Sequence, residues 1–162
     1  MPRQCWKGIP VGYQTVLVGT DGSDSSFKAV DRAAEIATGS DAKLVLVCAY
    51  HPLTGRQERQ AADELGDLKY KVAGSHPAED ILSDVSDRVR KAGVKKVDTI
   101  AEEGEPVDVL LEAAKSASAD LLVIGNRGLN SIAGRVLGSV PANVSHKAAC
   151  DVLIVHTTDR GK

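Results

Sequence analysis

Three glycines and a serine in the last third of this chain have a spacing that suits the binding of an anion. Gly125 and Gly128 are followed, after nine residues, by the pair Gly138-Ser139, and the string comes directly after the apolar run 121–124. A buried strand that ends in glycine presents backbone N–H groups that no side chain shields. A helix that begins near Gly138-Ser139 would add its unpaired first-turn N–H groups and the positive end of its dipole. Any one glycine could simply form a turn, but the whole string behind a strand predicts a phosphate site.

Side chains near these glycines could contribute to the same site. Ser139 could donate its hydroxyl to a phosphate oxygen while opening the helix, or it could only cap that helix. Arg127 and Arg135 are the cations of this loop, and each could reach a phosphate or stay solvated. Asp21, after an earlier apolar run, could accept hydrogen bonds from ribose hydroxyls or an adenine amine, or act as a helix N-cap.

Five short runs rich in Val, Leu and Ile recur along the chain, and most are continuously apolar, which is typical of parallel strands covered on both faces. Helical patterns lie between them. The runs that predict strands are 15–19, 44–50, 97–101, 120–125 and 151–156.

Four helices are predicted from the apolar spacing and the residues that flank it. The first follows Asp21 or Ser23 as N-cap and ends at Gly39; its inner face is Phe27, Val30, Ala33, Ala34 and Ala37. The second runs from Pro77 to Gly93 with Ala78, Ile81, Leu82, Val85 and Val89 inward. The third begins at Pro106 with Val107, Leu110, Leu111 and Ala114 inward, and a weaker fourth spans 140–149.

This alternation predicts an α/β fold: a doubly wound, Rossmann-like parallel sheet of five strands in the order 3-2-1-4-5, with helices on both faces. In such sheets a ligand binds outside the carboxyl ends of the strands where the winding reverses. Loops 19–23 and 125–128 both belong there. One domain is expected over 13–157, with disordered tails at 1–12 and 158–162 and a mobile connector at 54–75.

Composition excludes several classes of protein. A net charge of −2, with one Trp, three Tyr and one Phe, argues against nucleic-acid binding. The longest apolar run, 44–50, is far shorter than the roughly 20 residues of a membrane helix, and the amino terminus does not resemble a signal peptide. Three cysteines without C-x-x-C spacing and four histidines without metal-ligand spacing predict no disulfide scaffold and no metal site of protein ligands. A reduced, cytoplasmic location follows.

The chemistry of an efficient enzyme is not apparent. The chain has neither the Gly-x-x-x-x-Gly-Lys-[Ser/Thr] loop nor a Gly-x-Ser-x-Gly elbow. An adenylating enzyme of the ATP-pyrophosphatase type, using loop 20–25, is the alternative, although Asp21 stands where that loop needs glycine and would repel pyrophosphate. A flavodoxin-type carrier would need aromatic residues that this chain lacks.

The chain resembles the nucleotide-binding branch of the universal stress protein family. That branch carries Gly, two residues, Gly, nine residues, then Gly and Ser or Thr, which Gly125, Gly128, Gly138 and Ser139 match. The stretch 16–23, Val-Leu-Val-Gly-Thr-Asp-Gly-Ser, resembles its first strand and acidic turn, and 19–26 is similar to small actinobacterial members that bind cyclic AMP. Gly19 departs from the proline that is frequent there.

The resemblance implies a stress-response sensor or regulator with at most weak ATPase or self-phosphorylating activity. It places Asp21 near the adenosine, the Cys48 or Ala49 backbone at the adenine edge, Gly125 at the ribose, and the later residues at phosphate. ATP with magnesium, or else cyclic AMP, is the expected ligand. A homodimer is expected through Val152, Leu153, Ile154 and Val155, an apolar edge with no helix after it to cover it. The predicted nucleotide-binding residues are Gly19, Thr20, Asp21, Gly22, Ala49, Gly125, Asn126, Arg127, Gly128, Gly138, Ser139 and Val140.

Overall fold

Five parallel strands form a single sheet in the order β3-β2-β1-β4-β5, as the sequence predicts. The computed structural model describes residues 12–51, 77–127 and 137–157. The predicted tails and the connector at 54–75 lie, apart from Gly12, outside the described residues. The elements are β1 (Thr15–Gly19), α1 (Asp24–Ser40), β2 (Lys43–Tyr50), α4 (Pro77–Lys91), β3 (Val97–Glu103), α5 (Pro106–Ser116), β4 (Leu121–Gly125), α6 (Ser139–Lys147) and β5 (Asp151–Val155).

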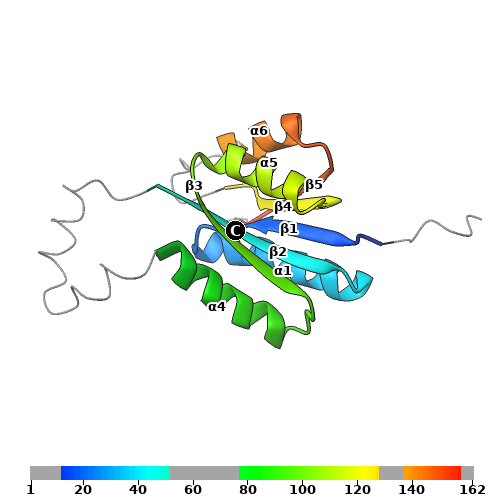
Figure 1. Ribbon diagram of the computed structural model, residues 1–162. Coiled ribbons are helices and arrows are strands. Elements are labelled where there is room, and N and C mark those ends of the chain that lie inside the picture. Colours follow the sequence, from blue (N-terminus) through cyan, green and yellow to red (C-terminus); the bar gives the residue numbers. More distant parts are fainter. Residues whose placement is uncertain (1–11, 52–76, 128–136, 158–162) are drawn as a thin grey trace, which may run out of the picture.

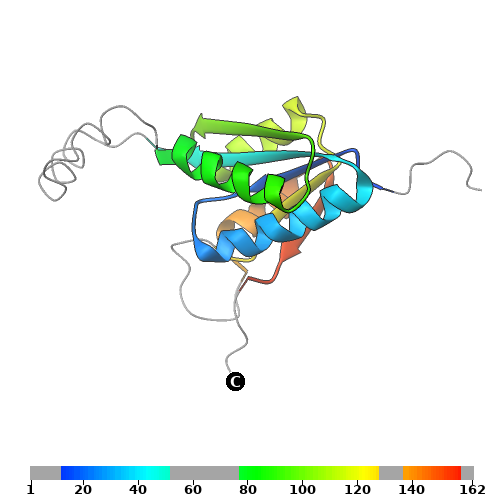
Figure 2. The ribbon, with the colours of Figure 1, turned by 90° about the horizontal axis from the view of Figure 1, so that it is seen from below.

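Helices cover both faces of the sheet (Figure 1): α1 and α4 lie on one face, and α5 and α6 lie on the other. Figure 2 shows α1 and α4 side by side. Side chains of β1 alternate between the two layers, since Val16 and Val18 pack against the α1 side and Leu17 against the α5 side. The central strands are therefore apolar at consecutive positions. Among the described residues, no helix has the length and apolar character needed to cross a membrane.

The helices differ from the sequence prediction in two respects, the end of α1 and the buried face of α5. Helix α1 begins after Ser23, whose hydroxyl accepts from the Ser26 N–H, but it continues through Gly39 and ends at Asp41, which takes the left-handed conformation with φ 50°. The expectation that Gly39 ends this helix is therefore wrong. Asp41 fills that role because a short polar side chain tolerates the left-handed region.

The inner face of α5 is rotated from the predicted one. Leu110 and Ala114 are buried as expected, but Val109 and Ala113 are buried beside them, whereas Val107 and Leu111 are half-buried. Both choices fit a helical spacing of three and four residues, because this helix is apolar around much of its circumference. The sequence pattern alone did not distinguish the two faces.

Candidate functional site

The carboxyl ends of β1 and β4 lie side by side. Val18 of β1 pairs with Val123 of β4, so the loops after Gly19 and Gly125 leave the sheet at the same edge. This is where the order of strands reverses direction, the usual place for a ligand in an open α/β sheet. The structure thus brings the two predicted loops together.

Asn126 joins three elements at this edge. Its backbone N–H donates to Val155 O of β5 at 2.9 Å, and its carbonyl accepts from Gly138 N at 3.0 Å, just before α6. Its side-chain Oδ1 accepts from both the N–H and the hydroxyl of Thr157, each at 2.8 Å. Asn126 is also a predicted ligand-binding residue, which stays a prediction; its Oδ1 and backbone groups hold β4, β5 and α6 in place. It acts on the site by positioning α6.

The first turn of α6 supplies the donors suited to an anion. Gly138 is the N-cap residue, and no side chain caps this end of the helix. The Ser139 hydroxyl is therefore not the helix cap, which was one of the two roles predicted for it. Ser139 is instead the first helical residue, and its side chain is exposed. The N–H groups of Ser139 and Val140 have no acceptor within the helix, and Pro141 has no N–H. Two amides and one hydroxyl therefore stand at the positive end of the α6 dipole.

Arg127 is the cation that the described part of this loop contributes. Its Nε is buried, and within the described part of the chain it has no hydrogen-bond partner. A buried charged donor without an acceptor is costly, so such a group usually marks a missing anion or water. Gly128 and Arg135, also expected at this loop, lie outside the described residues.

The loop after β1 is organised by its own hydroxyl groups. Thr20 is buried, and its hydroxyl lies 2.9 Å from that of Ser26 and accepts from Gly22 N at 3.2 Å. Asp21 Oδ1 accepts from the N–H and hydroxyl of Ser23, at 3.0 and 2.5 Å. Of the two residues proposed as N-cap, Ser23 is the cap and Asp21 orients it.

Asp21 lies close enough to the end of β2 for its charge to act on Cys48 of that strand. Burial raises the pKa of the Cys48 thiol, and the negative charge of Asp21 raises this pKa further. Ala49, predicted at the adenine edge, follows Cys48 and is half-buried. Thr20 N also donates to Val47 O at 2.9 Å. The Asp21 loop and the end of β2 therefore border the same side of the candidate site.

A side chain at the glycines of the site would come into close contact with other parts of the chain. A Cβ on Gly19 would lie 2.8 Å from Leu110 Cδ2, one on Gly125 would lie 3.1 Å from Thr157 Cγ2, and one on Gly138 would lie 3.2 Å from Asn126 O. Gly22 has φ +78°, a conformation that favours glycine. Packing within the chain favours glycine at these positions whether or not an anion binds, so α6 and Arg127 are the features that point to an anion.

Two polar residues of this region were not identified from the sequence. Thr157 and Ser26 are both buried, and each holds one of the two loops through its hydroxyl group. A signal for Thr157 is present in the sequence, since it comes one residue after the apolar strand β5, much as Thr20 directly follows β1.

Comparison with known proteins agrees with this architecture. The model of the universal stress protein family matches residues 12–156. The universal stress protein Rv1636 of Mycobacterium tuberculosis is 57% identical over 146 residues, which cover 90% of this chain and 98% of that protein. A universal stress protein solved in complex with cAMP is 48% identical, with a TM-score of 0.69, covering 91% of this chain and 99% of the other. The solved structure of Rv1636 itself gives a TM-score of 0.59, over 91% of this chain and 98% of the other.

Proposed function

We propose that this chain, which belongs to the universal stress protein family, binds an adenine nucleotide at the carboxyl ends of β1 and β4 and acts as a sensor or regulator. The observation that carries this proposal is the position of α6. Its first-turn amides are held against the end of β4 by the bond from Gly138 N to Asn126 O, at the edge where Asp21 also lies. Phosphate would bind at Ser139 and Val140, and the adenosine would lie toward Asp21 and Ala49.

Cyclic AMP is the ligand that the described donors suit best. Arg127 supplies the one positive charge among the described residues of loop 125–139, and it would join two amides and a hydroxyl. That set balances the single negative charge of a cyclic phosphate more closely than the several charges of ATP. The 48% identical relative solved with cAMP supports the same choice. ATP with magnesium, which the sequence slightly favoured, becomes the competing ligand.

Regulation by such a ligand follows from linkage. A ligand at about 100 times its Kd stabilises the folded state by roughly 2.7 kcal/mol. The ligand shifts the conformation of the loops it contacts only as far as it binds one conformation more tightly than the other. A cytoplasmic location stays a prediction from the sequence.

Two substitutions at one residue test the phosphate site. Ser139→Pro removes the N–H and the hydroxyl, yet proline is favoured at the first helical position. Gly138, with φ −60° and ψ 158°, already has the conformation that a residue before proline adopts. Ser139→Ala is the matched control because it removes only the hydroxyl.

Isothermal titration of nucleotide-stripped protein with cyclic AMP, and then with ATP and magnesium, gives the readout. We expect tighter binding of cyclic AMP, a loss of at least tenfold in Ser139→Pro, and a smaller loss in Ser139→Ala, since charge-assisted bonds to an anion are worth about 1.5–3 kcal/mol. Unchanged affinity in Ser139→Pro would exclude α6 as the phosphate site. Release of AMP and pyrophosphate from ATP would instead favour the adenylating alternative.

The same family resemblance leads us to propose a homodimer through β5, and the two sheet edges support it. Residues Val152–Val155 are apolar and half-buried on this edge, packing on both layers. At the opposite edge, β3 exposes Asp98, Glu102 and Glu103. An apolar edge strand is prone to pair with its own copy, whereas charges discourage such pairing.

A further inference from the structure

Strand β3 forms the edge of the sheet opposite β5, and the direction of its backbone groups can be read from its neighbour. Leu44 N of β2 donates to Lys96 O at 2.8 Å, and Gly104 N donates to Tyr50 O of β2 at 3.0 Å. Lys96 and Gly104 flank β3, so the even-numbered residues of this segment turn their backbone polar groups toward β2. Because successive residues of a strand alternate in direction, the odd-numbered ones turn theirs outward. They are Val97, Thr99, Ala101 and Glu103.

Only the beginning of this edge is covered within the described part of the chain. Arg90 Nη2 donates to Val97 O at 3.5 Å, and Arg90 Nε donates to Ser86 Oγ at 3.2 Å. This arrangement holds the guanidinium over the first outward carbonyl. Among the described residues, the backbone groups of Thr99, Ala101 and Glu103 that face outward have no partner. The open part of the edge therefore begins at Thr99.

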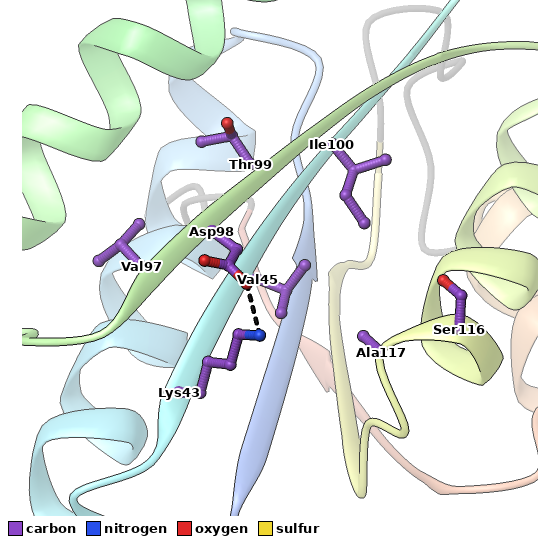
Figure 3. Close-up of a pocket in the computed structure, with 8 residues that line it drawn as sticks. All are labelled: Lys43, Val45, Val97, Asp98, Thr99, Ile100, Ser116 and Ala117. Atoms are coloured by element: carbon purple, nitrogen blue, oxygen red, sulfur yellow. Dashed lines mark ion pairs between the residues drawn. The ribbon is translucent and has the colours of Figure 1, made fainter.

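A cavity flanks this edge on each face of the sheet. On the α5 side, a cavity of about 530 Å³ is lined by Val45, Ile100 and Ala117, with the Lys43–Asp98 ion pair at its side. Figure 3 shows Val45 and Ile100 pointing to this side, and Val97 and Thr99 pointing to the other. The second cavity, of about 480 Å³, lies between β3 and α4.

The two cavities differ in chemistry. The one beside α4 is lined by buried Leu82, by the hydroxyl residues Ser83, Ser86 and Thr99, and by the acidic residues Glu79 and Asp87. It suits a long basic side chain, whose aliphatic stem can lie on Leu82 while its cationic end meets a carboxylate. The cavity beside α5 is lined by Val45, Ile100 and Ala117 together with polar residues, and its one carboxylate, Asp98, is paired with Lys43, so it suits an uncharged side chain rather than a cation.

The charge along the open part of the edge also favours a basic partner. Glu102 and Glu103 are exposed on β3, and Glu79 and Asp80 are exposed in the first turn of α4. The basic residues Arg90, Lys95 and Lys96 lie near the beginning of β3. An anionic edge repels nucleic acid and attracts a cationic chain.

We propose that the Thr99–Glu103 edge of β3 binds an extended basic peptide, which adds a sixth strand to the sheet. Main-chain hydrogen bonds to Thr99, Ala101 and Glu103 provide the affinity, and alternate side chains enter the cavities on the two faces, as in other cases of strand addition. The peptide carries Lys or Arg at the positions that face α4 and uncharged residues at those that face α5. This site lies apart from the nucleotide site and does not depend on it.

The test uses the full chain, labelled with ¹⁵N, and an acetylated seven-residue peptide that alternates Lys and Val. The matched control peptide replaces each Lys with Glu. We expect the Lys peptide to shift and protect the amides of Thr99, Ala101 and Glu103 in NMR spectra, with weaker binding at higher salt. The Glu peptide is expected to leave them unchanged.

Variants separate strand pairing from charge. Ala101→Pro removes an outward N–H that the fold does not use, which edge strands tolerate, and should weaken binding about fivefold. Ala101→Val keeps the N–H and has a side chain close to that of proline in size; because Ala101 also lines the cavity beside α4, this variant controls for the added bulk and should bind more tightly than Ala101→Pro. Glu79→Gln and Asp87→Asn, which do not threaten folding, should each weaken it about threefold.

Three results would overturn the proposal. The first is equal binding of the Glu peptide, and the second is a response centred on 152–155 rather than on β3. The third is protection of the β3 amides that grows with protein concentration in the absence of peptide, which would show that a second copy occupies this edge. Loss of the response in Ala101→Pro but not in Ala101→Val would support it.

Discussion

Replacing Asn126 by alanine should destabilise the protein strongly, even though the side chain is small and only partly buried. Its Oδ1 accepts two hydrogen bonds from Thr157, both at 2.8 Å, and Thr157 is 3% exposed. The backbone bonds of Asn126 to Val155 and Gly138 do not involve the side chain and survive in Asn126→Ala. The substitution therefore isolates the connection between the ends of β4 and β5.

The magnitude follows from what Thr157 loses. Its N–H would be left buried without an acceptor, which costs about 1–3 kcal/mol, and loss of the hydroxyl bond adds about 1 kcal/mol. We expect the free energy of unfolding to fall by roughly 2–4 kcal/mol. For a chain of this size, with about 2–4 °C per kcal/mol, the melting temperature should drop by roughly 5–15 °C.

Asn126→Asp is the matched control because it retains the oxygen that Thr157 contacts. It replaces Nδ2, which lies 3.4 Å from His156 Nδ1, by a carboxylate oxygen and adds one negative charge, but both bonds from Thr157 then go to an anionic acceptor, so a loss below about 1 kcal/mol is expected. Urea denaturation followed by circular dichroism measures both variants. If the two unfold at the same midpoint, the bonds to Thr157 do not carry the stability assigned to them, and the reasoning fails.

Three further perturbations test other parts of the molecule. Gly22→Ala should cost about 1–2 kcal/mol in urea denaturation, since its φ of +78° is left-handed and the new methyl would lie 2.9 Å from Ile81 Cδ1; a neutral result would mean that the loop relaxes freely. Burial, and then the charge of Asp21, raise the pKa of Cys48 in the folded state, so the stability that the protonated thiol contributes is complete below its unfolded pKa of about 8.5 and is lost as pH rises through the folded pKa. Unfolding measured from pH 7 to 10 should thus show a shallower alkaline loss in Cys48→Ala than in the parent. Val155→Lys should give a monomer in light scattering, whereas an unchanged mass would reject the β5 interface.

The positions of the strands and most helix limits were predictable because they depend on local signals. Continuous apolar runs mark strands buried on both faces, and Pro77, Pro106 and Gly93 mark helix limits. The face of α5 was less predictable, because Val107 and Leu111 are as apolar as Val109 and Ala113. Which side is buried depends on the helix packing against the sheet, a contact that is remote in sequence.

The site was predictable in its location but not in its internal bonding. The loops after β1 and β4 were expected to meet because the strand order requires it. Asn126 Oδ1 accepts hydrogen bonds from Thr157, 31 residues later in the chain. Neither residue alone predicts this contact. Glycine is equally compatible with a nearby anion and a nearby methyl group, and only the distances to Leu110 and Thr157 distinguish them at Gly19 and Gly125.

The two edges of the sheet are suited to different partners, and this has a consequence for the assembly. In a dimer formed through β5, each chain keeps its β3 at the far end of the combined sheet, since β3 and β5 are opposite edges. Two peptide sites then lie far apart and face outward, so neither blocks the other. We therefore expect one peptide per chain in the parent and in Val155→Lys, with equal affinity per site. A peptide that binds only the dimer would instead require an edge made by both copies, and would place its site at β5.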